Sequence, residues 1–337
     1  MPEHPNEEHH FSQNWQQQLR SAFKSIDELC HYLHLSTDDL SPSVAAARQF
    51  PVKVPLSFAA SMEKGNPDDP LLKQVLPIHE ETVTYPGFSH DPVGDVQAMP
   101  TAGLVHKYRG RALFITTGSC AINCRYCFRR NFPYSDLQLS KERENAAMQY
   151  IRDDSSLSEI ILSGGDPLLL SDDRLKELMR QIEAIAHVRR IRIHSRLPIV
   201  LPARITDELL EMLSQSPLKI VLVVHCNHAN EINERVSCAL KRLRNKGLVV
   251  FNQAVLLKGV NDKADVLCQL SETLFAQDVI PYYLHLLDKA SGTGHFEVSK
   301  QDALALIKEI QAYLPGYLVP RLVKERVGAL AKESVFA

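Results

Sequence analysis

The sequence has no excess of charge of either sign and no long apolar run. Its 337 residues include 38 Lys and Arg against 40 Asp and Glu, a net charge of −2. That balance gives no overall attraction to nucleic acid or to an anionic membrane. No apolar stretch approaches the roughly 20 residues of a transmembrane helix. The first ten residues, MPEHPNEEHH, lack the basic and apolar parts of a signal peptide. We therefore expect a cytoplasmic protein with no nucleic-acid or membrane partner.

The sequence also lacks the features of a disulfide-rich or a non-globular chain. Seven cysteines are an odd number, and in a large chain expected to stay reduced they argue against a disulfide framework. Hydrophobic residues make up 45% and charged residues 23%, which excludes a disordered, collagen-like or coiled-coil protein. The length fits about two domains, or one barrel-like α/β domain with an appendage.

The first hundred residues predict helices followed by an irregular segment. Apolar residues from Trp15 to Leu33 recur three or four positions apart, which indicates one amphipathic helix with Ser12 as its N-cap. A second helical piece is expected near 57–64, and a turn of helix beginning at Pro70. Residues 77–105 are rich in Pro, Gly and Asp and show no period. We interpret 1–100 as an N-terminal helical and irregular extension.

From about residue 111, short apolar runs alternate with amphipathic stretches. Apart from a longer interval between the first two runs, the runs begin about 30 residues apart, which is the length of a βαβ unit. The expected strands are 112–116, 160–163, 191–194, 220–225, 249–257 and 282–287. This pattern predicts a parallel sheet covered on both faces, either an open doubly wound sheet or an incomplete barrel. Polar residues cluster just after the strands, where both folds place their active sites.

Three cysteines lie within eight residues directly after the first expected strand: Cys120, Cys124 and Cys127. Thiolates this close can converge on one metal centre. A structural zinc site needs four ligands, and no other Cys or His lies between Gly118 and Tyr150. A four-iron cluster held by three cysteines leaves one iron open for substrate. The C-x3-C-x2-C spacing, with an aromatic residue before the last Cys, resembles the signature of the radical S-adenosylmethionine enzymes. Zinc or structural thiols remain the alternative.

A companion motif, Ser163-Gly164-Gly165-Asp166, comes at the end of the second expected strand. In the radical enzymes a glycine pair at this point lets the backbone approach the methionine amino group, because glycine has no Cβ. In most other proteins the same letters would mark only a strand-to-helix turn. The resemblance implies that S-adenosylmethionine is bound by Ser163, Gly164, Gly165, Asp166 and Gln253. It also implies an incomplete (βα)6 barrel of the TIM type over 101–315, followed by a tail at 316–337.

Longer segments narrow the resemblance to the lysine 2,3-aminomutase family. They run from about Lys64 to Pro320 and include HKYRGRALFITTGSCAINCRYCFRR, ILSGGDPLL, RIRIHSRLPIVLPARIT, NQAVLLKGVND and PYYLHLLDKASGTGHF. The segment MEKGNPDDPLLKQVL and the compact C-terminus resemble the shorter bacterial branch that modifies elongation factor P. The resemblance implies an isomerase that converts L-α-lysine to (R)-β-lysine, which a ligase attaches to that factor. It implies a 4Fe-4S cluster, S-adenosylmethionine and pyridoxal 5'-phosphate as cofactors.

The resemblance places the pyridoxal phosphate lysine at Lys332. This residue stands in the family's register after GYLVP at 316–320, although GALAKE at 328–333 departs from the paired glycines and Lys-Thr-Pro of relatives. Lys324, in an expected short strand, is the fallback, and a solvated tail lysine is the plain alternative. The phosphate side of the cofactor matches Lys107, Tyr108 and Arg111, which could also form a basic surface patch.

A lysine substrate needs a cation for its carboxylate and an anion for its ε-ammonium group. Arg129 matches the family's carboxylate-binding arginine, and Asp288 matches its ammonium-binding aspartate. Glu325 stands where long-chain relatives have a second aspartate. Each could instead belong to a structural ion pair. Gln253 and His228 are further candidates at the rim of the site.

Other functions remain open from the sequence. A free-lysine or glutamate 2,3-aminomutase in catabolism or osmolyte synthesis would keep the chemistry, although Asp288 would repel the side chain of glutamate. A non-catalytic iron–sulfur regulator is the alternative from another class. The chain has no cysteines after Lys332, so we do not expect the zinc that long-chain relatives bind between subunits. The oligomeric state stays open, with a homodimer favoured.

Overall fold

The strands of the chain form one sheet in which they follow each other in chain order. A computed structural model describes residues 7–40, 42–134 and 140–336. Its strands are β1 Leu104–Tyr108, β2 Arg111–Thr117, β3 Glu159–Gly164, β4 Arg190–Ser195, β5 Lys219–Val224, β6 Val249–Val255, β7 Ile280–His285, β8 Arg321–Lys324 and β9 Glu333–Ser334. Strands β2 to β8 are parallel, whereas β1 and β9 pair antiparallel at the two edges.

This topology confirms the incomplete barrel and excludes the doubly wound alternative. A doubly wound sheet reverses its strand order at a switch point, but here the order runs from β1 to β9 without a reversal. The six strands expected from apolar runs correspond to β2 to β7. The short strands β1 and β9 were not predicted, because they are too brief and too polar to show a period.

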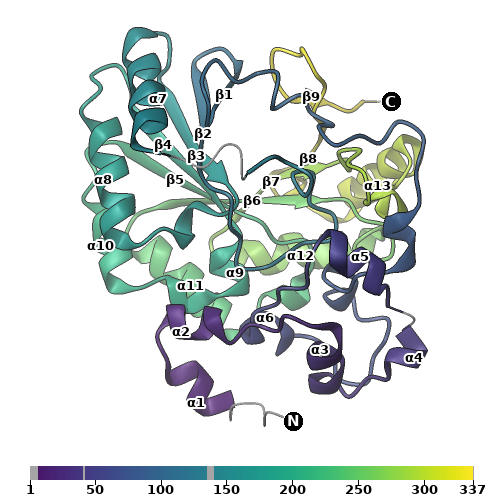
Figure 1. Ribbon diagram of the computed structural model, residues 1–337. Helices are drawn as coiled ribbons and strands as arrows, with labels where there is room; N and C mark the ends of the chain where they lie inside the picture. The colour runs from purple at the N-terminus through teal and green to yellow at the C-terminus, as the bar shows by residue number, and fades with distance from the viewer. Residues whose placement is uncertain (1–6, 41, 135–139, 337) are drawn as a thin grey trace.

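Helices cover the outer face of the barrel and gather at one end of it (Figure 1). They are α1 Glu7–Ser12, α2 Trp15–Arg20, α3 Ile26–Tyr32, α4 Thr37–Leu40, α5 Val44–Gln49, α6 Leu56–Ala59, α7 Lys141–Asp153, α8 Asp172–Glu183, α9 Leu197–Val200, α10 Asp207–Ser214, α11 Glu234–Asn245, α12 Ala264–Phe275 and α13 Lys300–Tyr313. The 3-10 helices are η1 Leu72–Gln74, η2 His79–Thr82, η3 Pro167–Leu169, η4 Pro202–Arg204, η5 Ala229–Glu231, η6 Gly294–Phe296 and η7 Gly316–Leu318. Within the described residues, no helix has the length and apolar character needed to span a membrane.

The N-terminal extension is helical, but its boundaries differ from those predicted. The single helix expected after Ser12 is two helices, α2 and α3. Asn14, not Ser12, caps α2 by accepting a hydrogen bond from the backbone of Gln17, and Ser25 begins α3 in the same way. Each start is a capping box, which fixes a helix end more strongly than apolar spacing alone indicates. The second expected helix is shortened to α6, and the turn expected at Pro70 is η1.

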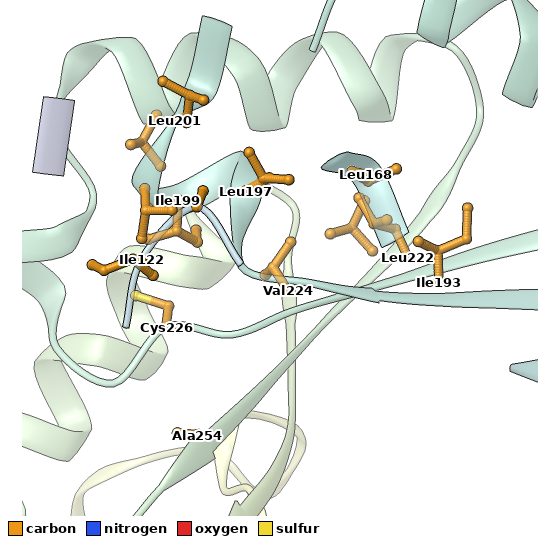
Figure 2. Close-up of a cluster of buried hydrophobic side chains, with 14 of the residues drawn as sticks. Ile122, Leu168, Ile193, Leu197, Ile199, Leu201, Leu222, Val224, Cys226 and Ala254 are labelled. Carbon is orange, nitrogen blue, oxygen red and sulfur yellow. The ribbon is translucent and has the colours of Figure 1, made fainter. Parts of the chain in front are cut away.

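Side-chain alternation along the strands separates the core from the barrel interior. Ile191 and Ile193 of β4 are fully buried, whereas Arg192 and His194 between and after them line a cavity. Successive side chains of a strand point to opposite faces. Figure 2 shows part of the core, including Ile193, with residues of β5 and β6 and Ile122 from the cysteine segment. The apolar face of the sheet packs against the helices, and the polar face is left for the site.

Candidate active site

A cavity of about 660 Å³ opens where the parallel strands end. The main site residues predicted from the sequence all line it: Cys120, Cys124, Cys127, Ser163, Gly164, Gly165, Asp166, Gln253, Lys107, Tyr108, Arg111, Arg129, Asp288, Glu325 and Lys332. His228, the weaker candidate, lies outside it and caps η5, with its Nδ1 accepting a hydrogen bond from Asn230 N at 3.1 Å. The fold therefore brings together residues that are more than 200 positions apart in the chain.

The cysteine segment after β2 is held in place by residues of the N-terminal extension. Lys53 Nζ donates a hydrogen bond to the carbonyl of Cys120 at 2.6 Å, and the backbone N–H of Asn123 donates to the carbonyl of Lys53 at 3.0 Å. Arg125 is fully buried and pairs with Glu81. A buried ion pair of this kind fixes geometry more than it adds stability. The three thiols thus sit on a braced segment at the cavity wall.

The donor set fits an iron–sulfur cluster better than a single ion. Burial is the main cause that raises the pKa of the Cys127 thiol to about 11, and it also raises the pKa of Cys120. These thiols become thiolates when cationic iron binds them. Among the described residues, no three His, Cys, Asp or Glu side chains are placed to hold one metal ion. That observation disfavours the zinc alternative, whereas a cluster needs one cysteine for each of three separate irons.

The two glycines after β3 are required by the backbone of the cysteine segment. A Cβ on Gly165 would lie 2.1 Å from the carbonyl oxygen of Ser119, and a Cβ on Gly164 would lie 2.6 Å from the carbonyl oxygen of Thr117. The N–H of Gly165 donates to that Thr117 carbonyl at 2.6 Å. The glycine pair therefore seats the cysteine segment against β3, in addition to bordering the cavity.

Gly165→Ala is expected to destabilise the protein and to reduce its iron content after anaerobic reconstitution. Overpacking of this kind costs about 1–3 kcal/mol, and the strain falls directly on the segment that bears the cysteines. Gly316→Ala is the matched control, because nothing lies within 4 Å of its Cβ position and its φ is not positive. Thermal melts and iron analysis check both variants; equal iron content in the two would contradict the seating role.

Asp166 turns its carboxylate into the protein. It accepts hydrogen bonds from Ser195 Oγ and from the backbone N–H of Arg196, each at 2.8 Å, and from the N–H groups of Leu168 and Leu197. Burial raises its pKa to about 6 against the lowering effect of these bonds. The carboxylate ties the end of β3 to the end of β4, so a direct contact with S-adenosylmethionine remains a prediction.

A chain of ion pairs crosses the cavity. Asp95 contacts Arg129 at 2.7 Å and Lys107 at 2.5 Å, and Glu325 contacts Lys107 and Lys332, each at 2.8 Å. Asp95 is buried, and its pKa is lowered because the two cations outweigh the effect of burial. The sequence did not predict Asp95, because it lies in the irregular segment with no motif around it. It orients the arginine and lysine that the sequence did predict.

Tyr108 and Arg111 form an aromatic and cationic part of the cavity wall next to Lys107. The Arg111 guanidinium lies 4.8 Å from the centre of the Tyr108 ring. Within the described part of the chain, no ion pair engages Arg111, and the buried Tyr108 hydroxyl lies beside the Glu325 carboxylate. A ring to stack on, a free guanidinium and a nearby lysine are the features that an aromatic phosphate ligand requires. These residues fit pyridoxal phosphate.

Asp288 is a partly buried carboxylate that lines the cavity. No ion pair reaches it within the described ranges. Burial raises its pKa to about 7, although the positive charge of Lys332 lowers it in part. An uncompensated carboxylate in such a place is unfavourable unless a cation arrives. The site therefore favours a ligand with a positive charge at this end.

Three histidines at strand ends also line the cavity, and no role was predicted for them. His194 lies in β4, His225 directly follows β5, and His285 ends β7. His225 Nε2 lies 3.4 Å from His194 Nδ1. Burial lowers the pKa of all three, to about 4 for His225, so they are neutral near pH 7. The only sequence feature that indicates these histidines is their position at the ends of apolar runs.

Comparisons with known proteins agree with this geometry. Residues 114–270 match the family model described as the radical SAM superfamily. The chain is 47% identical over 321 residues to L-lysine 2,3-aminomutase of Escherichia coli, covering 95% of this chain and 94% of that protein. It is 33% identical to L-lysine 2,3-aminomutase of Clostridium subterminale, over 96% of this chain and 77% of that protein.

The fold is also similar to a solved structure of low sequence identity. Streptococcus suis SuiB bound to S-adenosylmethionine superposes with a TM-score of 0.51 at 14% identity, over 65% of this chain and 51% of SuiB. This chain thus spans about half the length of SuiB. At this identity the similarity concerns the barrel alone.

Proposed function

Because this chain belongs to the lysine 2,3-aminomutase family of radical S-adenosylmethionine enzymes, we propose that it converts L-α-lysine to (R)-β-lysine. It is an isomerase that uses a 4Fe-4S cluster, S-adenosylmethionine and pyridoxal 5'-phosphate. When bound, these cofactors supply radical chemistry and carry the migrating amino group. The observation that supports the proposal best is that one cavity holds the cysteines, Lys332 and charges complementary to both ends of lysine.

In this proposal the two ends of the cavity have separate tasks. Cys120, Cys124 and Cys127 hold the cluster, and the backbone and side chains after β3 and in β6 hold S-adenosylmethionine. Lys332 would hold the pyridoxal group covalently, and Tyr108 would offer its ring for stacking. Arg111 and Lys107 bind its phosphate, for which Arg111 has no competing ion pair among the residues described. The surrounding wall excludes water from the reacting groups.

The substrate lies between these ends. Arg129 binds the α-carboxylate: its Nε and Nη2 are held by Asp95, while Nη1 reaches into the cavity and donates to Ser163 Oγ at 3.2 Å. Asp288 binds the ε-ammonium group, and Glu325 adds a second negative charge nearby. Glu325 pairs with Lys332 and with Lys107, each at 2.8 Å, so it would orient the lysine that is to hold the pyridoxal group.

The direct test is the anaerobic, reduced protein supplied with the three cofactors. L-lysine should yield β-lysine, and L-glutamate should yield no product, because its side-chain carboxylate would meet Asp288 and Glu325. Turnover of glutamate in preference to lysine would contradict the substrate assignment. A visible spectrum with cluster bands but no pyridoxal bands, and no turnover of either amino acid, would favour the regulator.

We further propose that β-lysine is made for elongation factor P, to which a ligase attaches it in the cytoplasm. Support comes from the resemblance of 62–76 to that branch. The match also covers 94% of the Escherichia coli relative but 77% of the clostridial one, which fits the shorter branch. Incubation of this enzyme with lysine, ligase and the factor, followed by hydrolysis, should release β-lysine from the factor. Recovery of α-lysine alone would contradict this role in modifying the factor, but it would not contradict the isomerase activity.

Asp288→Asn is expected to weaken lysine use and to remove a pH dependence. Loss of one partner of a buried charge pair costs about 3–5 kcal/mol, so kcat/KM should fall on the order of 100-fold or more. The wild-type carboxyl has a pKa raised to about 7 by burial, and only its charged form attracts ammonium. Wild-type KM for lysine should therefore decrease as pH rises through 7.

The Asp288→Asn variant should lack this decrease while keeping its iron. KM values for lysine measured between pH 6 and 9 check the expectation. Parallel pH profiles in the two proteins would show that Asp288 faces another group.

A further inference from the structure

Arg196 lies directly beside one of the three cysteine sulfurs. It follows β4, and its Nη1 donates a hydrogen bond to Cys124 Sγ at 2.7 Å. The side chain is nearly fully buried. Neither the strand pattern nor the cysteine motif assigns it a role, because its proximity to Cys124 arises only when β2 and β4 are brought into one barrel.

The guanidinium is fixed by residues from two other parts of the chain. Nη2 donates to Gln74 Oε1 at 2.7 Å and to Glu231 Oε2 at 3.1 Å. Gln74 also donates to Glu231, at 3.1 Å, and both side chains are buried. The rings of Phe58 and Tyr126 lie 5.1 and 5.5 Å from the guanidinium carbon. Such a braced group cannot swing away when the charge on its neighbour changes.

The arrangement places a cation next to the sulfur and an anion behind the cation. Hydrogen bonds to cysteine sulfur and nearby charge set the potential of iron–sulfur clusters. In a buried site these charges act through a low dielectric. A positive group beside the sulfur stabilises the added electron of the reduced cluster, and a negative group opposes it.

We propose that Arg196 and Glu231 are positioning residues that jointly set the reduction potential of the cluster at Cys120, Cys124 and Cys127. Arg196 raises the potential and Glu231 lowers it. The inference rests on the proposed cluster site but not on the identity of the amino-acid substrate. It concerns the one-electron reduction of the cluster, for which the test uses dithionite as electron donor.

The test is a redox titration of the anaerobically reconstituted proteins, followed by electron paramagnetic resonance without S-adenosylmethionine. Arg196→Gln should lower the potential, and Glu231→Gln should raise it, each by about tenfold in the reduction equilibrium, or 59 mV. Arg196→Lys keeps the charge and should lie nearer to wild type than Arg196→Gln. The Arg196→Gln/Glu231→Gln double variant should return toward wild type, because the two losses of charge oppose each other.

Arg204→Gln is the matched control. Arg204 is equally buried but pairs with Asp172 and backbone carbonyls, so its loss should leave the potential near the wild-type value. If loss of any buried arginine changes the reduction potential, Arg196→Gln and Arg204→Gln should shift it by similar amounts. That result would overturn the proposal. If Arg196→Gln fails to hold iron, Glu231→Gln and Arg196→Lys still decide, because an unchanged potential in Glu231→Gln overturns it.

The cluster and the role of Arg196 and Glu231 are tested by different results. Wild-type protein that binds no cluster would end the proposed function and this inference with it. Wild-type protein with a cluster and normal lysine conversion, but with potentials that do not move in opposite directions in the two charge variants, would overturn only the role of Arg196 and Glu231.

Discussion

Lys332→Ala is expected to hold its iron but to form no pyridoxyl adduct after borohydride reduction, and its aminomutase activity should fall to background. Lys332 lines the cavity with a side chain 21% exposed, and its Nζ contacts Glu325 at 2.8 Å. A lysine that holds pyridoxal covalently must reach the ring from inside the site. In the wild-type protein, peptide mass mapping should therefore place the pyridoxyl group on Lys332.

Lys324→Ala is the matched control for this experiment. Lys324 does not line the cavity, its side chain is 49% exposed, and it lies 3.7 Å from Glu333. Its removal should leave the adduct on Lys332 and the activity near wild type. An adduct on Lys324 or on Lys107, or none in the wild-type protein, would contradict the assignment.

The structure also shows how the tail can keep its position although its sequence departs from the family. β9 pairs antiparallel with β8, in the register Val323 to Ser334 and Lys324 to Glu333. Lys332 comes immediately before β9, so the hairpin directs it over the cavity. The paired glycines of relatives are replaced by one glycine, Gly328, which has a φ of +77° with nothing within 4 Å of its Cβ position. One left-handed residue therefore lies within this turn.

The contrast between Lys332 and Asp95 shows what could be predicted from the sequence. Lys332 was located because it follows a motif at a fixed distance along the chain. Asp95 lies in an irregular segment, and its contacts with Arg129 and Lys107 exist only after the segment folds across the strand ends. Periodicity predicts elements, and motifs predict local chemistry, but neither gives pairs formed between distant loops.

The same limit explains the differences in the fold. The strands β2 to β7 were predicted because their apolar residues are buried against helices along the whole length of each strand. The break between α2 and α3 was missed because the apolar spacing continues across it. Phe23, within that break, instead exchanges backbone hydrogen bonds with Val54 at 2.8 and 3.0 Å. A tertiary contact therefore interrupts a pattern that locally favours helix.

Cys124→Ala is expected to lose both the cluster and all aminomutase activity. The reconstituted wild-type protein should contain about four irons per chain, and the variant close to none. Two cysteines cannot hold the cluster with one iron open. Among the described residues, no group of three potential ligands offers a substitute site. Cys226, a buried cysteine outside the motif, donates to the carbonyl of His228 at 3.3 Å and does not line the cavity.

The variant should also be less stable than the cluster-free wild type. Removal of the sulfur leaves Arg196 Nη1, which donates to Cys124 Sγ at 2.7 Å, without that acceptor in a buried place. An unsatisfied buried donor costs about 1–3 kcal/mol. Thermal melts of the apo proteins test this cost independently of iron. Cys238→Ala, at an exposed cysteine, should match wild type in iron, activity and stability. Normal iron content in Cys124→Ala would overturn the cluster assignment. The protein would then hold its iron through residues other than Cys120, Cys124 and Cys127.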